Sequence, residues 1–540
     1  MDCSAKKRII WALALLVCFH TANNYAIAAS NKAPLYHNSG DHLVNQNIQF
    51  QEISEWEWHA NFFAGRYPAI LTILLYPYYW AAGINQTSVI MSNALFLAIL
   101  VASVYGIGKR LHSCKAGLLA AFTVTVFPQV FGLSRDYDMR FHLAAMVCLS
   151  IYLMLRSDGF TRTWYSLLFG MAAGFGAGIK PEFSLFVIGP FIGIIARSMH
   201  KEISKGRQFL PALLKNLGVS LAGFMLVYII NGGLNPYSLQ HSLYAISPYK
   251  DSVSPDALFY VKSLVGIQVL HYFSALLIAA IAYAILRRRY SLLLTWFFVP
   301  LLFFTVVAYA NPSIIFMVSA MPAVALLISV FICSARSANL RKTMAYTVIL
   351  VGLAQFFVIS YVPTAYPGIS RVNRALGITN IQPNLPQDFL DYDGMSFPAQ
   401  TQYIGFLHAY RHDWGINSVS SMISYEAAGN GTHVTVIVID SAVNHVIAQP
   451  LRYGLYLQGI RNAEVIPIED YDFQRPAGYR GSVNPRELLA DADYFVLTDV
   501  TPQMKSAQEM AAGIRKTHRH AGDTLLPNGI LISVYKNSFK

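Results

Sequence analysis

The stretch Tyr36–Pro68, YHNSGDHLVNQNIQFQEISEWEWHANFFAGRYP, lies between two strongly apolar regions of the chain. It gathers acidic residues and histidines, Asp41 among them, in a protein in which only 13% of the residues are charged. Ionisable residues at the edge of a membrane span are candidates for function, although a solvated loop explains them equally well. The rest of the sequence decides between these two interpretations.

The composition indicates a polytopic α-helical membrane protein. The chain has 540 residues, of which 55% are hydrophobic and 13% charged, about half the charged share of a water-soluble domain. Runs of roughly 20 apolar residues, the length that crosses a bilayer, recur from Ile9 to Tyr361. The net charge of +12 does not indicate nucleic-acid binding, because Lys and Arg collect in the short cytoplasmic loops of membrane proteins. No cysteine follows Pro363, so the C-terminal region has no internal disulfide.

The N-terminus allows two interpretations. Lys6, Lys7 and Arg8 precede an apolar core and small residues, as in a cleavable signal peptide. The alternative is a retained first span, Ile9 to about Ala29. We favour the retained span, because the topology of the remaining chain works with it.

Basic loops alternate along the chain and predict the orientation of each span. Placing them in the cytoplasm gives eleven spans, a first outside loop at residues 30–87 and a C-terminus outside. The apolar piece Tyr67–Ala82 is rich in Tyr and Trp, so we expect it at the outer interface; as a full span it would invert everything after it. The predicted spans cover about residues 9–29, 88–108, 116–133, 139–155, 164–179, 183–196, 210–230 and 344–361, and three more end near residues 287, 311 and 336.

The composition changes at about Pro363, where charges rise and long apolar runs stop. The chain thus divides into a transmembrane domain, residues 1–362, and an extracytoplasmic α/β domain, residues 363–540. The second domain has no phosphate-binding glycine fingerprint after its first strand, so we expect it to shape the substrate site or act as a scaffold. Its predicted strands lie at residues 432–442, 463–468, 492–499 and 529–537, with a helix at residues 445–459.

Ionisable residues recur in the predicted outside pieces. Besides the stretch around Asp41, they lie at residues 134–138, at residues 180–182 and at residues 231–250, which include His241. Lys180 stands between two apolar runs, and a Lys at the centre of a spanning helix costs about 2.5–3.5 kcal/mol on insertion scales. Such a residue is usually paired or faces water, although a lysine that reaches out from a turn and a self-paired turn at residues 135–138 remain the simpler alternatives.

Three motifs follow one another in a fixed order. Gly106-Ile107-Gly108-Lys109-Arg110 ends one span, Ser134-Arg135…Asp138-Met139 forms the next outside turn, and Gly178-Ile179-Lys180-Pro181 forms a hinge. Together they resemble the polyprenyl-phosphate-sugar-dependent glycosyltransferases of the GT-C fold, which include protein mannosyltransferases and aminoarabinose transferases. That family also has an acidic pair in the first outside loop, where this chain has Gly40-Asp41-His42, and a later His-Pro-Pro element, where it has Arg66-Tyr67-Pro68.

The resemblance implies a function for these positions. Asp41 is the expected general base that takes the proton of the acceptor hydroxyl. Arg135 and Lys180 are expected on the rim of one outward-facing cavity, where they bind the donor phosphate. His42 departs from the family's second acid and is an alternative base. The possible supporting residues are His42, Arg66, Asp136, Asp138, Glu182 and His241.

The sequence therefore predicts a glycosyltransferase of the plasma (inner) membrane that moves a sugar from a polyprenyl phosphate to an acceptor hydroxyl outside. A single displacement would invert the anomeric configuration. The partners are the lipid-linked sugar, a glycan, lipid or protein acceptor, and membrane lipids, with no nucleic acid. No catalytic cofactor is expected, although a divalent cation such as Mg²⁺ or Mn²⁺ stays open. The alternatives are a transporter or flippase for a lipid-linked sugar, and a membrane-bound scaffold.

Overall fold

The computed structural model of the chain divides into two compact units, which we describe separately. The first consists of Met1–Ala29, Ile48–Asn384 and Ala399–His408, and the second of Ser30–Asn47, Leu385–Pro398 and Ala409–Lys540. The residues that the structure describes are 3–31, 37–56, 69–203, 209–231, 258–307, 314–362, 372–373, 375–376, 391–392, 395–396, 416–427, 433–439, 451–455, 458, 460, 462–468, 492–498, 505–525 and 531–539.

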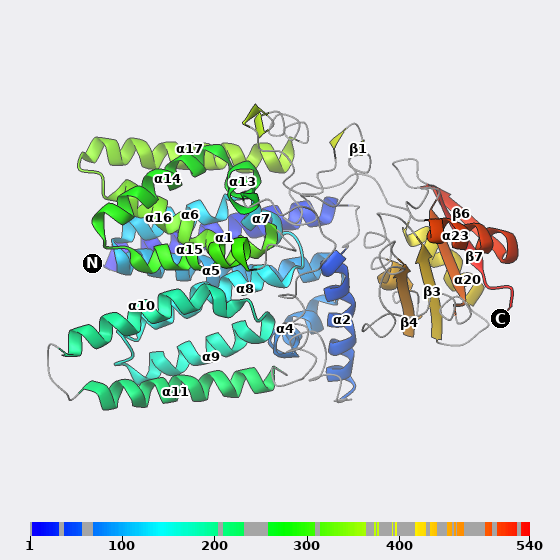
Figure 1. The fold of residues 1–540 in the computed structure, drawn as a ribbon, viewed down its shortest axis with the longest axis horizontal. Coiled ribbons are helices and arrows are strands. Elements are labelled where there is room, and N and C mark those ends of the chain that lie inside the picture. The colour runs from blue at the N-terminus through cyan, green and yellow to red at the C-terminus, as the bar shows by residue number, and fades with distance from the viewer. Residues whose placement is uncertain are drawn as a thin grey trace. The chain divides into compact units, whose positions relative to one another are not determined.

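The first unit is a bundle of apolar helices (Figure 1). Within the described residues, eight helices are long and apolar enough to cross a membrane, or nine if the pair α6 and α7, bent by 67°, counts as one span. Helices α9 and α15, with 17 and 16 residues, fall below this length, so the count of eleven spans stays a prediction. In chain order the helices at the predicted spans are α1 (Cys3–Ser30), α5 (Gln86–Leu111), α6 (Cys114–Thr125) with α7 (Pro128–Ser134), α8 (Met139–Arg156), α9 (Thr163–Ile179), α10 (Phe183–Ile203), α11 (Phe209–Ile230), α14 (Leu270–Arg287), α15 (Ser291–Val306), η2 (Ile314–Ala320) with α16 (Met321–Cys333), and α17 (Ala338–Tyr361).

The predicted first outside loop contains two helices, α2 (His37–Ser54) and α4 (Ala69–Ala82). With 14 residues, α4 is about 21 Å long, too short to cross a bilayer by itself. The part of α2 in the first unit packs on α4. The rings of Phe50 and Tyr76 lie 5.0 Å apart, Ser54 and Tyr76 share a hydrogen bond of 3.2 Å, and the Thr72 hydroxyl donates to the Gln49 side chain.

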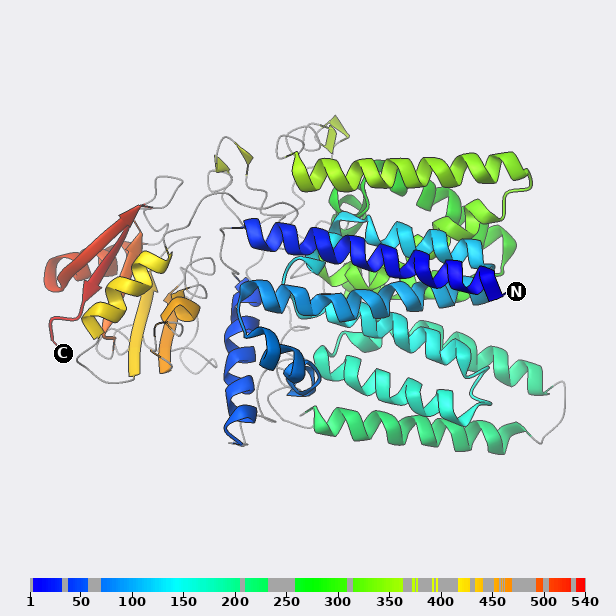
Figure 2. The same ribbon diagram turned by 180° about the vertical axis from the view of Figure 1, so that it is seen from behind.

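Helices α9 and α11 pack closely because glycines line the face of α9. An added Cβ at Gly170 would lie 1.9 Å from the carbonyl oxygen of Ser220, and one at Gly174 would lie 2.4 Å from that of Phe224. Small residues at a spacing of four allow helix backbones in a membrane protein to approach in this way. Both views of the ribbon, Figure 1 and Figure 2, show α9, α11 and α10 together on one side of the bundle.

We predict that Gly170→Ala lowers the midpoint of thermal unfolding in detergent, because the new methyl group overpacks a contact with backbone and costs about 1–3 kcal/mol. Gly218→Ala is the matched control on α11, since nothing lies within 4 Å of its added Cβ. Alanine also favours helix over glycine, so the control should unfold at the wild-type temperature or slightly above it. Equal midpoints for the two variants would contradict the packing argument.

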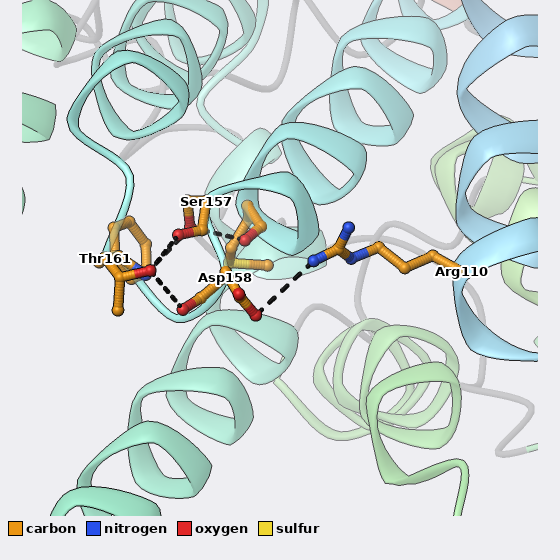
Figure 3. Close-up of polar contacts among 6 residues, drawn as sticks. Arg110, Ser157, Asp158 and Thr161 are labelled. Atoms are coloured by element: carbon orange, nitrogen blue, oxygen red, sulfur yellow. Dashed lines mark hydrogen bonds and ion pairs between the residues drawn. The ribbon is translucent and has the colours of Figure 1, made fainter.

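The turn between α8 and α9 is held by its own polar groups (Figure 3). The Thr161 hydroxyl donates to the carbonyl oxygens of Ser157, at 3.3 Å, and Asp158, at 3.1 Å, and Arg110 of α5 lies 3.7 Å from the Asp158 carboxylate. Asp158 and Phe160 have positive φ angles of 56° and 64°, which are unusual for residues other than glycine. The bonds therefore fix a conformation that the backbone would not hold by itself.

The second unit contains a five-stranded mixed sheet in the order β4-β3-β5-β7-β6. The strand β3 (His433–Ile439) is parallel to β4 (Asn462–Ile468) and β5 (Tyr494–Thr498), whereas β7 (Leu531–Lys536) is antiparallel to β5 and to β6 (Arg519–Leu525). Four of these strands match the predicted ones, and residues 451–455 of the predicted helix are helical. The sequence did not predict β6, α20 (Ile416–Ala427), α23 (Lys505–Thr517) or the two-stranded pair β1 (Asp391–Tyr392) and β2 (Met395–Ser396).

The central strands of this sheet are buried on both faces, because successive residues of β3 and β5, which point to opposite faces, are all buried. On one face, Ala511 and Ile514 of α23 pack against Ile437 and Phe495. At the end of α23, the ring of His518 lies 4.7 Å from the ring of Phe495 and 5.5 Å from that of Phe539. Partial burial lowers the pKa of His518 below its ordinary value.

This burial predicts a pH dependence for the second unit. Because the unfolded chain binds the His518 proton more readily than the folded unit, the stability is complete above the unfolded pKa, about 6.5, and falls as the pH drops through the lower folded pKa. We expect His518→Phe, which keeps the aromatic contacts, to reduce the loss of amide protection in β5 and β7 between pH 7.5 and 5.5. Hydrogen exchange of the full chain measures this loss of amide protection in the wild type and in the variant. An equal loss in both would exclude His518 as the cause.

Candidate functional site

The outside turn predicted at residues 134–138 is held by two buried asparagines from other helices. The Asn24 amide of α1 donates to the carbonyl oxygen of Ser134 at 3.1 Å and to its hydroxyl at 3.0 Å. The Asn93 amide of α5 donates to the same carbonyl oxygen at 3.1 Å and to that of Asp136 at 2.6 Å. The turn is thus fixed by groups outside it as well as by the pairing within it that its sequence suggested.

Arg135 is fully buried, with a relative exposure of 0%. Its guanidinium carbon lies 4.8 Å from the Phe131 ring of α7 and 4.9 Å from the Phe356 ring of α17, and its Nε donates to the Asn24 Oδ1 at 3.3 Å. The expectation that Arg135 stands on the rim of an open cavity is therefore wrong. Its charge is placed where it links α1, α7 and α17, because aromatic faces and an amide oxygen accept a cation that water no longer reaches.

Asp138 begins α8 and pairs with an arginine that the sequence analysis did not single out. Its Oδ1 accepts the Arg140 backbone N–H at 2.7 Å as the N-cap, and its Oδ2 lies 3.2 Å from the Arg140 Nη1. The Asp138 side chain is 6% exposed and that of Arg140 is 12% exposed. The pair therefore lies nearer to the surface than Arg135, on the same turn.

Tyr137 connects the turn to helix α4 through a buried hydrogen bond. Its hydroxyl lies 3.1 Å from that of Tyr79 on α4, and the Tyr79 hydroxyl donates to Ser92 of α5 at 3.2 Å. Burial, together with the neighbouring Tyr79, raises the pKa of Tyr137 well above its ordinary range, so this phenol stays neutral. It acts here as a hydrogen-bonding group that joins α4 to the turn.

The predicted hinge at residues 180–182 lies between α9 and α10, at the end of the bundle that also holds Asp138, because α8 and α9 run in opposite directions (Figure 1). Lys180 caps α9, its N–H donating to the carbonyl oxygen of Gly176 at 3.2 Å. Lys180 and Glu182 are both partly exposed. Beside the hinge, Asn231, which directly follows α11, accepts the Ile70 N–H of α4 at 3.3 Å.

The other predicted site residues belong to the second unit or lie outside the described residues. Asp41 and His42 lie on α2, in the second unit; His42 is buried, and the Asp41 side chain lies outside the described residues, as do Arg66 and His241. Within the described part of the chain, no group of three or more His, Cys, Asp or Glu residues could hold a metal ion. The described site thus consists of the turn at residues 134–140 and the hinge at residues 180–182.

We predict that Asn24→Ala destabilises the protein by about 1–3 kcal/mol. The substitution removes the Asn24 Oδ1, which accepts from the buried Arg135, and the Asn24 amide, which donates to Ser134. Asn23→Ala is the matched control on the same helix, since among the described residues Asn23 hydrogen-bonds to the phenol of Tyr361 and the carbonyl oxygen of Phe19 at less buried positions. The thermal midpoints of the two variants in detergent compare them. If Asn23→Ala lowered the thermal midpoint as much as Asn24→Ala, the loss would come from any substitution in this part of α1 and not from the contacts of Asn24.

Comparison with protein families indicates the class to which this arrangement belongs. Residues 78–228, which include the turn and the hinge, match the family described as "Dolichyl-phosphate-mannose-protein mannosyltransferase". No curated protein matches the chain at a significant level.

Two solved structures share the fold over almost the whole chain. The structure of ArnT from Cupriavidus metallidurans bound to undecaprenyl phosphate has a TM-score of 0.57 at 12% identity and covers 96% of this chain and 97% of that one. The archaeal oligosaccharyltransferase AglB from Archaeoglobus fulgidus, in complex with an inhibitory peptide and a dolichol-phosphate, has a TM-score of 0.53 at 12% identity and covers 99% of this chain and 75% of that one. The likeness to these structures concerns the fold.

The chain therefore has the fold of these two structures over almost its whole length, and residues 78–228 resemble the mannosyltransferase family. The resemblance deduced from the order of the three sequence motifs is confirmed. The predicted fold class, a helical bundle followed by a small α/β unit, is confirmed as well.

Proposed function

We propose that this protein transfers a sugar from a polyprenyl-phosphate donor to an acceptor hydroxyl on the outer side of the plasma (inner) membrane, with inversion and with Asp41 as the general base. One observation carries most of the proposal: the fold extends over 96% or more of the chain to proteins whose structures contain undecaprenyl phosphate or dolichol-phosphate. A lipid-linked donor suits a site at the end of a helical bundle, because its tail stays in the bilayer.

The chemistry needs two kinds of group. A carboxylate takes the proton of the attacking hydroxyl, and Asp41, directly after the first span and on α2, is proposed for this role. Cations stabilise the lipid phosphate as it leaves with increasing negative charge. Lys180, partly exposed at the hinge, is proposed as one of them. Arg135 was predicted as another, and its burial between Phe131 and Phe356 favours a role in holding the turn.

The remaining assignments belong to the same proposal. Residues 1–362 form the catalytic domain, and residues 363–540 form an extracytoplasmic domain that shapes the acceptor site or acts as a scaffold. The acceptor is a glycan, a lipid or a protein. A transporter or flippase for a lipid-linked sugar is the competing function, because it would use the same cations and would need no base.

We predict that Asp41→Asn lowers the rate of sugar transfer by about 10²–10⁴-fold and leaves donor binding unchanged, because the amide cannot accept the proton. The measurement is turnover of a lipid-linked sugar by the purified protein, with binding of undecaprenyl phosphate determined for each variant.

His42→Ala and Glu52→Gln are the comparison variants on the same helix. Loss of turnover in His42→Ala with an active Asp41→Asn would reverse the two roles. Full activity in all three would place the base elsewhere, with Asp136 and Asp138 next to be tested. A wild type that moves the lipid-linked sugar across a vesicle membrane without transferring the sugar would support the transporter instead.

A further inference from the structure

We propose that Arg140 is a donor-phosphate ligand of this protein and that its guanidinium is the cation of the outside turn that an incoming phosphate contacts. This assignment rests on the proposed function, since it concerns the lipid phosphate of that donor. It transfers to Arg140 the role that the sequence pattern suggested for Arg135.

The hydrogen bonds of Arg140 leave donors unused. An arginine side chain offers five N–H groups in one plane. Nη1 lies 3.2 Å from the Asp138 Oδ2, and Nε, which is a buried atom, has no hydrogen-bond partner among the residues that the structure describes. The Phe316 ring of η2, 5.1 Å from the guanidinium carbon, covers one face of the plane. The ring therefore leaves the edges of the plane for hydrogen bonds, and a phosphate accepts such in-plane bonds in pairs.

The position of Arg140 favours an anion. It lies in the first turn of α8, an 18-residue helix whose N-terminus carries the positive end of the helix dipole. A cation that is seven-eighths buried at this end is unfavourable unless negative charge is near, and Asp138 supplies one carboxylate. That carboxylate also caps the helix, since its Oδ1 accepts the Arg140 backbone N–H. A phosphate would add the negative charge that the two positive groups still attract.

The two arginines of the turn differ in access. Arg135 has a relative exposure of 0% and both faces of its guanidinium are covered, by Phe131 and by Phe356. Arg140 keeps 12% exposure and has one face against an aromatic ring. A ligand can therefore reach Arg140 without separating α1 or α17 from the bundle, which it would have to do to reach Arg135.

The test compares two arginines at opposite ends of α8. Arg140→Ala and Arg156→Ala each delete one cation from the same helix, and Arg156 stacks on Tyr165 at the end away from the turn. Binding of undecaprenyl phosphate to the detergent-purified full chain is measured with each. Phosphatidylglycerol and inorganic phosphate serve as competitors that separate the polyprenyl phosphate from other sources of the same group. We expect at least 10-fold weaker binding for Arg140→Ala and wild-type binding for Arg156→Ala.

A conservative variant keeps the test decisive if Arg140→Ala does not fold. Arg140→Lys retains a charge beside Asp138 and loses the planar pair of donors, so we expect binding that is about 3- to 10-fold weaker than wild type. Wild-type affinity in the folded Arg140 variants, or equal losses in Arg140→Ala and Arg156→Ala, would overturn the assignment. Competition by phosphatidylglycerol as strong as that by polyprenyl phosphate would overturn it as well, since Arg140 would then hold a bilayer lipid. A wild type that binds no polyprenyl phosphate would instead refute the proposed function itself.

Discussion

The burial of one guanidinium determines how the end of the bundle around residues 134–138 is built. Removing the charge of Arg135 from water costs several kcal/mol unless other groups replace the lost hydration. Phe131, Phe356 and the side-chain oxygen of Asn24 are those groups, and they come from three different helices. The helix α1 is the least buried of the candidate spans, with 11% of its apolar window buried. The polar contacts of Asn24 therefore matter more for its position than they would in a helix buried on all sides.

A second constraint places the hinge. Glycines along α9 let its backbone touch that of α11, so the ends of the two helices lie side by side. An added Cβ at Gly178 would collide with Asn231 at the end of α11, and Asn231 in turn accepts a hydrogen bond from the first turns of α4. The hinge with Lys180 is thus held from three elements. Close helix packing, which is a matter of backbone shape, sets the position of a charged side chain.

The sequence predicted those helices and strands that are marked by a long apolar run or by residues typical of strands. Each span is a long apolar run, and the four predicted strands are rich in Val, Ile, Tyr or Phe. The missed strand β6, RHAGDTL, has no such run, and α23 was missed because Met510 and Ile514 are its only apolar residues larger than alanine. The environment of Arg135 could not be predicted either, because its partner Asn24 lies 111 positions away. A lone Asn in an apolar run signals a buried contact, yet does not say with which carbonyl group.

The charges of the turn bear on how a phosphate would be recognised under the proposed function. Between residues 135 and 140, two arginines and two aspartates balance, so the turn attracts an anion only weakly from a distance. Recognition then depends on the directions of individual N–H groups. Asn24 and Asn93 fix the backbone of the turn, and Asp138 orients Arg140 through both of its oxygens. Donors fixed in this way need no reorganisation when charge builds up on a leaving phosphate, which is how a site with no net charge can favour the transition state over the bound donor.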